Sequence, residues 1–307
     1  MDGEIANPAA GKMRQLSAQE LRQVLQLHER FLAHRHDGQR AVLAYYDLSS
    51  TDLSGHDLSE ADLTGARLNR TILSNTRLRN ANLFAADLRV ANLNNADLSG
   101  ADLRASCLRG AQLNRAKLPK ADLRRGVVVR FPGPGVANNG AGESVRTDLS
   151  SVEAQDADLS GARLSDASCV RANLTDANLR DTDFCGADLR NADITGAVLE
   201  RADLSSANLN GAILRGAVLT EVKFGGAELQ DVDISGAILD PALLQEAKQR
   251  QLKGSAVKPI SLAELEETLQ LHAQWLDSKG GRGRRAVLTD CDLSGRDLRA
   301  ANLALAS

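Results

Sequence analysis

Every fifth residue of this chain is apolar over most of its length. From Leu43 to Leu123 there are 17 centres at five-residue spacing, and all 17 are leucine. From Leu149 to Leu239 there are 19 more, of which 13 are Leu, two Ile, two Phe, one Cys and one Ala. Ala stands two residues before the centre in 25 of these 36 repeats. Internal repetition on this scale constrains the architecture more than any other feature of a chain.

A period of five fits neither an α-helix, which repeats every 3.6 residues, nor a plain strand, which repeats every two. The pattern instead predicts a short extended segment followed by a corner. In extended backbone, residues two apart point to the same side, so the centre and the small residue before it face inward together. The residue two after the centre is often Gly or Asn, which tolerate the positive φ of a tight turn.

Repeats such as ADLSG, ADLRA and ANLTD over residues 41–125 and 147–240 resemble the pentapeptide-repeat family, whose pattern is A(D/N)LxG. The resemblance implies an all-β solenoid, a right-handed quadrilateral β-helix with four pentapeptides per coil. The larger and branched centres fit this period, because they recur 20 residues apart: Phe184, Leu204 and Phe224, and Ile194, Leu214 and Ile234. Nine coils at about 4.8 Å each would make a rod of about 43 Å.

The N-terminal region is predicted to cap this rod. Residues 1–15 are expected to form a disordered tail, and residues 16–40 an N-terminal cap helix. Ser17 followed by Glu20 is a capping box, which marks the start of the helix. Such a helix would cover the open end of the solenoid, where backbone groups are otherwise unpaired.

Residues 126–146 break the register, because Leu149 follows Leu123 by 26 residues, which is not a multiple of five. The PGPG and NNGAG stretches in this segment disfavour regular strand. We interpret it as a loop extruded between two segments that stack continuously. The alternative is a linker between two separate domains.

The C-terminal region repeats the sequence of the N-terminal cap. Residues 241–285 are expected to form C-terminal helices, and residues 286–307 a restarted single repeat coil. Four residues that correspond between the two copies are expected to pack the caps: His28, Phe31, His272 and Trp275. One coil is not stable alone, so we expect the restarted coil to dock on a solenoid end of another subunit and make a homo-oligomer. The alternative is the remnant of a truncated tandem repeat.

Composition bears on the compartment. The sequence has no run of 18 apolar residues, so no membrane span is expected. Its first 15 residues lack the apolar core of a secretory signal. The four cysteines do not form a disulfide framework, and unpaired thiols are typical of a reducing compartment. We therefore expect a cytoplasmic protein.

The two repeat segments differ in charge. Residues 41–125 hold 12 basic and 9 acidic residues, a net charge of +3, whereas residues 147–240 hold 7 basic and 17 acidic residues, a net charge of −10. The acidic segment is either a solvated surface, since Asp before Leu is the default of the repeat, or a mimic of the DNA backbone. Five carboxylates are the candidate contacts: Asp158, Asp183, Asp188, Asp193 and Asp203. Direct nucleic-acid binding is not expected, because the basic excess is small.

A row of apolar residues occupies outward positions of the second segment. Val198, Val218 and Ile238 fall on successive coils, with Ile213 on the adjoining side. An apolar row on a polar rod needs a cover. Either the helices of 241–277 fold back over it, or it is a dimer or partner site.

Nothing in the sequence predicts an enzyme. The five histidines lack metal-ligand spacing with cysteine, and no phosphate-binding glycine motif is present, so no cofactor or metal site is expected. The prediction is a non-enzymatic scaffold that binds a protein partner. The alternative rests on the resemblance: some pentapeptide-repeat proteins bind DNA gyrase or topoisomerase IV by imitating DNA, dimerise through a C-terminal helix and confer quinolone resistance. Those proteins lack this N-terminal cap, and the basic first segment also departs from that design.

Overall fold

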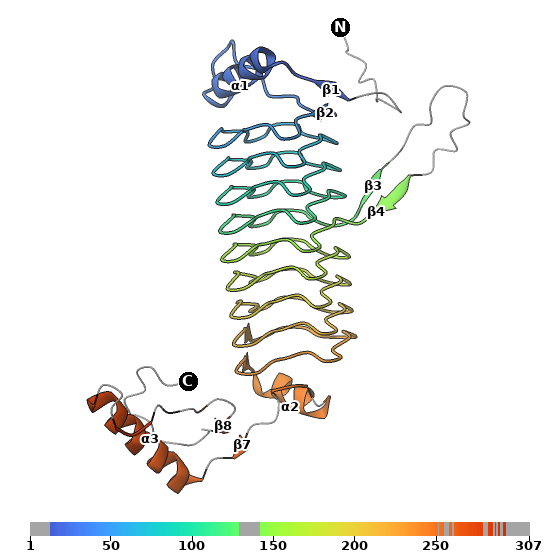
Figure 1. The fold of residues 1–307 in the computed structure, drawn as a ribbon. Helices are drawn as coiled ribbons and strands as arrows, with labels where there is room; N and C mark the ends of the chain where they lie inside the picture. Colours follow the sequence, from blue (N-terminus) through green and yellow to red (C-terminus); the bar gives the residue numbers. More distant parts are fainter. Residues whose placement is uncertain are drawn as a thin grey trace.

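The pentapeptides wind into an elongated rod with helices at both ends and a hairpin projecting from its side (Figure 1). In this computed structural model, parallel backbone bridges join residues 20 positions apart, as in Val42 to Asp62 and Asp62 to Asn82. Four pentapeptides therefore complete one coil. The predicted β-helical solenoid is confirmed, whereas its right-handed sense stays a prediction.

The structure describes residues 13–128, 142–250, 252–254, 258–259, 261–278, 282–284, 286, 288 and 291–292. Within these ranges, most sides of the coils contribute a single bridging residue, and the regular strands of the coils are two residues long. These short strands are β2 (Tyr46–Asp47), β5 (Val218–Leu219) and β6 (Ile238–Leu239). The rod has less extended strand than an all-β class suggests, because every pentapeptide also turns a corner.

A column of leucines fills the rod. The centres from Leu43 to Leu123 are at most 2 % exposed, and each buried leucine contributes roughly 1.5–3 kcal/mol before entropy is counted. The small residue two positions before each centre also faces inward and fills the space between neighbouring leucines of the coil. Where threonine replaces alanine there, its hydroxyl is satisfied: Oγ1 of Thr71 donates to the carbonyl of Leu48, and Oγ1 of Thr182 to that of Leu159, both at 2.9 Å.

Each corner places the residue two after the centre in the left-handed region. Asn75 (φ 58°) and Gly65 (φ 59°) adopt it readily, but Val90 is a β-branched residue at φ 59° and 58 % exposed. Left-handed backbone costs an L-residue about 1–2 kcal/mol, and asparagine tolerates it best after glycine.

We therefore expect Val90→Asn to stabilise the rod by about 1 kcal/mol. Chemical denaturation of the variant and the natural protein measures this difference. Val170→Asn is the control, since Val170 is not among the residues with positive φ and the same exchange there should give no gain. Equal effects of the two exchanges would contradict the explanation by backbone strain.

The first coil is closed by helix α1 (Ala18–Leu32) and strand β1 (Arg14–Gln15). The capping box is present: Oγ of Ser17 accepts from the Glu20 amide at 3.2 Å, and Oε2 of Glu20 accepts from the Ser17 amide at 2.7 Å. β1 pairs in parallel with β2, so the tail predicted for residues 1–15 extends too far. The edge of the first coil offers unpaired backbone groups, and residues 14 and 15 satisfy them. Residues 1–12 lie outside the described part.

A hairpin leaves the rod halfway along its length. β3 (Gly126–Val128) and β4 (Glu143–Val145) are antiparallel, whereas the segment was predicted to be loop throughout. The coils on either side stack directly, because Cys107 bridges to Asp148, 41 positions on instead of 20. The 21 extra residues are therefore extruded, and the alternative of an interdomain linker is wrong. Residues 129–141 lie outside the described part.

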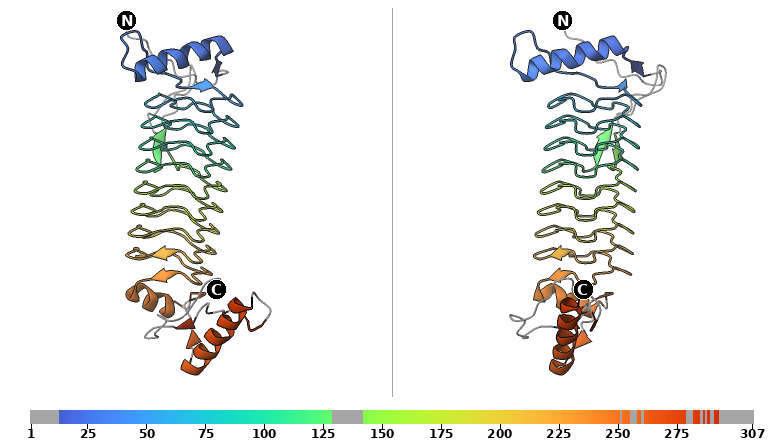
Figure 2. Two further views of the ribbon diagram at one scale, coloured as in Figure 1. Left: turned by 90° about the vertical axis from the view of Figure 1, so that its left-hand side faces the viewer. Right: turned by 60° about the vertical axis from the view of Figure 1, so that its left-hand side comes forward.

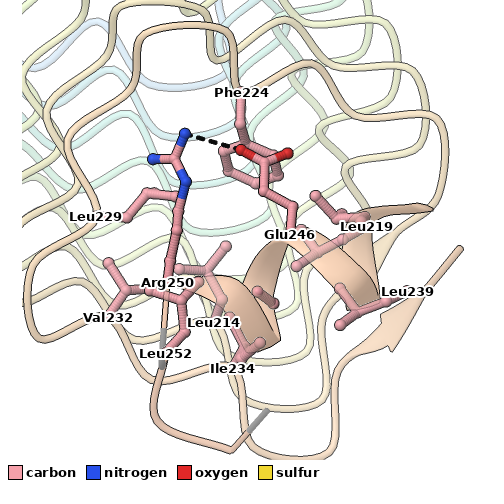
Figure 3. A pocket seen from close by; sticks show the side chains of 12 residues that line it. Leu214, Leu219, Phe224, Leu229, Val232, Ile234, Leu239, Glu246, Arg250 and Leu252 are labelled. Atoms are coloured by element: carbon pink, nitrogen blue, oxygen red, sulfur yellow. Dashed lines mark ion pairs between the residues drawn. The ribbon is translucent and has the colours of Figure 1, made fainter. Parts of the chain in front are cut away.

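The far end of the rod is closed by helix α2 (Pro241–Gln249). Oδ1 of Asp240 accepts from the Leu243 amide at 2.9 Å and caps the helix, and Ala247 is buried against the core. Between α2 and the last coil lies an apolar cavity of about 20 Å³, with the Glu246–Arg250 ion pair at 2.8 Å beside it (Figure 3). A space of this size has no room for a ligand. We interpret it as a packing gap.

The C-terminal module repeats the N-terminal cap in three dimensions. Helix α3 (Leu262–Asp277) begins with the same capping box, formed by Ser261 and Glu264. Strand β7 (Lys258–Pro259) pairs in parallel with β8 (Cys291–Asp292), as β1 does with β2. The predicted restarted coil at 286–307 lies mostly outside the described residues, and its strand β8 is paired within the same chain. Docking of this coil on another subunit stays a prediction.

The four predicted cap residues form two matched stacks. The rings of His28 and Phe31 have centroids 5.7 Å apart, and those of His272 and Trp275 are 5.8 Å apart. In both copies the histidine is fully buried. The module lies beyond α2 at the far end of the rod in all three ribbon views (Figures 1 and 2).

Candidate protein-interaction surface

Three apolar side chains form a stripe on one side of the rod near α2. Val198 bridges to Val218, and Val218 to Ile238, so the three residues stack on consecutive coils as predicted from their spacing. We call this set the apolar stripe. Ile238 is 57 % exposed, while Val198 and Val218 are half-buried. Ile213 lies on the adjoining side, where it bridges to Asp193 and Asp233.

The helices do not cover the apolar stripe. Helix α2 lies across the end of the rod, where Leu243 and Ala247 pack on the core. Ile238 keeps more than half of its surface in solvent. The alternative that the helices of this region fold back over the row is therefore wrong at Ile238, because the apolar face of α2 is already occupied by the open end of the leucine column.

The corner that precedes the apolar stripe contains a glycine on each of the three coils. Gly196, Gly216 and Gly236 stand two residues before the three stripe residues, each with positive φ of 63–70°. A Cβ atom added at Gly216 would meet nothing within 4 Å. The edge is therefore open beside Val218, where the backbone of a partner can approach the stripe closely, whereas the Asp176 carboxylate lies beside Gly196.

The opposite border of the apolar stripe is polar and internally neutralised. Nε of Arg180 lies 3.0 Å from Glu200, and the guanidinium of Arg201 contacts Asp181 at 2.7 Å and Glu200 at 3.2 Å. Arg180 and Asp181 follow Asn178, and Glu200 and Arg201 follow Val198, by two and three residues. The paired rim therefore borders the Val198 end of the apolar stripe. An apolar centre with a paired polar rim is the arrangement found in protein interfaces.

The five predicted acidic contacts do not form one surface. Asp183 and Asp203 bridge to each other, whereas the other three lie on separate ladders. The separate ladders are identified by these bridges: Asp158 to Asn178, Asp188 to Asn208, and Asp193 to Ile213. The five residues therefore occupy all four sides of the rod, because a five-residue step moves to the next side. A contact through the acidic faces of the second segment stays a prediction, and no single side of the rod presents all five carboxylates.

These carboxylates have a role in the fold. Where Asp or Asn stands immediately before a centre, its Oδ1 commonly accepts a hydrogen bond from the amide two positions on, as Asp158 does from Ser160 and Asp203 from Ser205, both at 3.0 Å. This Asx contact fixes the turn after the centre. The Ser205 hydroxyl and amide hold the pKa of Asp203 below its usual range. The recurring Asp-Leu-Ser spacing was the sequence signal for this role.

Where a longer side chain stands immediately before the centre, another side chain accepts the hydrogen bond from the turn amide. Where Gln112 stands before the centre, the amide of Asn114 bonds Oδ1 of Asn94, one coil earlier, at 3.0 Å. Where Glu153 stands there, the amide of Gln155 bonds Oδ1 of Asn114, also at 3.0 Å. An asparagine ladder thus replaces the local turn contact and accounts for the amide-rich side of the rod.

We expect Asn114→Ala to destabilise the rod by about 1–2 kcal/mol, because the Gln155 amide loses its acceptor. Ser74→Ala is the matched control at the equivalent position two coils earlier, since the Ser74 hydroxyl makes no hydrogen bond to a described residue. Denaturant midpoints of the two variants compare them. Equal midpoints would show that water replaces the asparagine oxygen at no cost.

Among the described residues, no three His, Cys, Asp or Glu side chains are placed to hold a metal ion. Among the helices described, none is long and apolar enough to cross a membrane.

Stacked four-sided coils with helical caps define a β-helical repeat protein. The model of the family described as pentapeptide repeats matches eight copies, over residues 47–80, 81–118, 167–205 and 197–236. The chain belongs to the pentapeptide repeat family. No curated protein matches it.

Solved structures of pentapeptide repeat proteins are similar to the chain. One is HetL from the cyanobacterium Nostoc sp. strain PCC 7120, involved in heterocyst differentiation regulation, with 33 % identity over 73 % of this chain and 97 % of that one and a TM-score of 0.41. Another is Rfr23 from the cyanobacterium Cyanothece 51142, with 31 % identity over 45 % of this chain and 91 % of that one and a TM-score of 0.33. Full-length QnrB1, a plasmid-mediated fluoroquinolone resistance protein, shares 19 % identity over 69 % and 97 % of the two chains, with a TM-score of 0.33.

Proposed function

We propose that this protein is a non-enzymatic scaffold that binds a protein partner through the apolar stripe. The observation that carries the proposal is the exposure of Ile238, in line with Val198 and Val218, on a rod whose other outward positions are mostly polar. Burying such a stripe removes apolar surface from water and rewards association. The proposal also places the protein in the cytoplasm, where the four free cysteines would stay reduced.

The rod suits this role because its side chains stand at fixed spacing. Every coil is held by backbone hydrogen bonds to its neighbours, for example Leu199 to Val218 at 2.8 Å and Val218 to Ala197 at 2.9 Å. The stripe is therefore preorganised, and a partner loses little affinity to ordering it.

The test is affinity capture from extracts of the cells that make the protein, with natural protein, Val218→Lys and Ile72→Lys as baits. Lysine occupies the same outward position at Lys117 and Lys223, so the fold tolerates it there. We expect Val218→Lys to reduce capture of the specific partner at least tenfold. Ile72→Lys changes an equally outward apolar residue of the first segment, 40 % exposed, and should leave capture unchanged. Equal capture by all three baits would refute the proposal.

The alternative of a DNA-mimicking binder of gyrase or topoisomerase IV rests on the charge of the second segment. Asp183 and Asp203 are the only pair of the five that shares a ladder, so reversing both to lysine is its sharpest test. Recovery of topoisomerase subunits by the natural protein, lost with this double reversal and kept with Val218→Lys, would favour the alternative.

A further inference from the structure

His28 joins the cap helix to the first coil. It lies on the inner side of α1 and is fully buried, and its Nδ1 accepts a hydrogen bond from the Ala41 amide at 3.1 Å. The carbonyl of Ala41 in turn accepts from the Asp62 amide on the next coil at 2.9 Å. One imidazole therefore connects α1 to the backbone ladder of the rod.

This contact depends on the protonation state of the ring. Nδ1 can accept a hydrogen bond only when it carries no proton, so the ring is neutral and its proton is on Nε2. Nε2 of His28 is shielded from solvent, and no described residue accepts from it at good hydrogen-bond geometry. A proton added at Nδ1 would turn an N–H towards the N–H of Ala41 and remove the bond.

We propose that His28 is a pH-sensitive latch that holds the N-terminal cap closed when it is neutral and releases the cap when it is protonated. Release would uncover the edge of β2, which β1 covers in the closed state. An uncovered strand edge is a surface that pairs with another chain. Acidification would thus convert a closed rod end into an assembly edge.

The groups that face His28 set the direction of the effect. Burial lowers the pKa of His28, and the positive charge of Arg40 lowers it further. The Ser59 backbone and the carboxylates of Asp57 and Glu60 raise it, but the net effect keeps the pKa below the usual 6.5. The released cap has a solvated His28 and binds the proton more readily. The latch therefore contributes fully above about pH 6.5 and is lost as the pH falls from there towards the lower pKa of the closed state.

The second copy of the cap contains the same contact. Nδ1 of His272 accepts from the Ala286 amide at 3.1 Å, and His272 is also fully buried. The ring stacked on it differs, Trp275 in place of Phe31, and the acceptor bond is kept. The recurrence shows that the contact belongs to the construction of the cap and not to one local packing accident.

Hydrogen exchange of the intact chain at pH 7.5 and pH 5.0, corrected for intrinsic exchange rates, tests the latch. In the natural protein, protection of residues 14–47 should fall at least tenfold at pH 5.0, while residues 61–123 keep theirs. His28→Gln keeps an acceptor oxygen without a titrating ring, so its cap protection should not depend on pH. His36→Gln, at an exposed histidine, should behave as the natural protein. Equal protection at both pH values, or the same fall in His28→Gln, would overturn the proposal.

A second measurement covers the case in which His28→Gln loses the cap at every pH. Histidine-selective NMR of the natural protein follows the Nδ1 and Nε2 signals of His28 during acidification. We expect Nδ1 to be unprotonated at pH 7.5 and to gain its proton in step with the loss of cap protection. A ring that stays neutral while the cap opens, or a cap that stays closed around a protonated ring, would overturn the proposal.

Discussion

Leu93→Asp is expected to unfold the coils around it. Leu93 is fully buried in the middle of the leucine column, and its replacement puts a carboxylate among apolar side chains with no cation to pair with. Loss of a buried leucine alone costs about 2–5 kcal/mol, and burial of an unpaired charge adds several more. We expect loss of the folded first segment, measured as a fall in circular dichroism and as proteolysis between residues 61 and 123.

Asn92→Asp provides the matched control for this change. It introduces the same carboxylate one residue earlier, at an outward position that Asp occupies on many coils. Its stability should lie within about 0.5 kcal/mol of the natural protein. A soluble Leu93→Asp protein with unchanged melting would contradict the inward assignment of the centres.

Asp233→Asn is expected to loosen the closed end of the rod by about 2 kcal/mol. Asp233 is 4 % exposed, and its carboxylate accepts from Arg215 at 2.7 Å and contacts Lys253 at 2.8 Å. Lys253 follows α2, so its ion pair with Asp233 holds the segment after the helix against the rod. The effect stays below that of a fully buried pair, because both cationic side chains are more than half exposed.

The pH dependence of this contact has a definite sign. Burial alone would raise the pKa of Asp233, but the hydrogen bonds from Lys253, Ser235 and Arg215 outweigh burial and hold the pKa far below 3.8. The carboxylate therefore stabilises the fold above about pH 4, and this contribution is lost as the pH falls towards the pKa of the folded state.

Denaturation of the natural protein and Asp233→Asn at pH 7 and pH 3 measures this change. The difference between the two proteins should be smaller at pH 3. Asp193→Asn, on the same ladder two coils earlier, bonds only the amide and hydroxyl of Thr195 and should cost less. A larger effect of Asp193→Asn would show that the charge network at the closed end contributes little.

Periodic features of this fold could be predicted from the sequence, because each pentapeptide determines the conformation of its own side of a coil. The inward Leu column, the corner at Asn75 and the capping boxes at Ser17 and Ser261 all depend on residues at most four positions apart. Local interactions of this kind can be predicted directly from neighbouring residues in the sequence.

Features that depend on distant contacts were not predictable in this way. Arg14 and Gln15 pair with β2 because a coil edge needs a partner, and their own sequence gives no strand signal. The acidic residues of the second segment read as one charged surface in the sequence, yet a step of five residues rotates them to different sides. Exposure of Ile238 depends on where α2 packs, which the spacing of its residues does not determine.

The central claim, that the apolar stripe contacts a partner, is tested most directly by photocrosslinking in living cells. A benzophenone amino acid is placed at position 218 in one variant and at position 72 in another. We predict one discrete crosslinked product from position 218 and none of that size from position 72. No product from position 218, or the same products from both positions, would contradict the account.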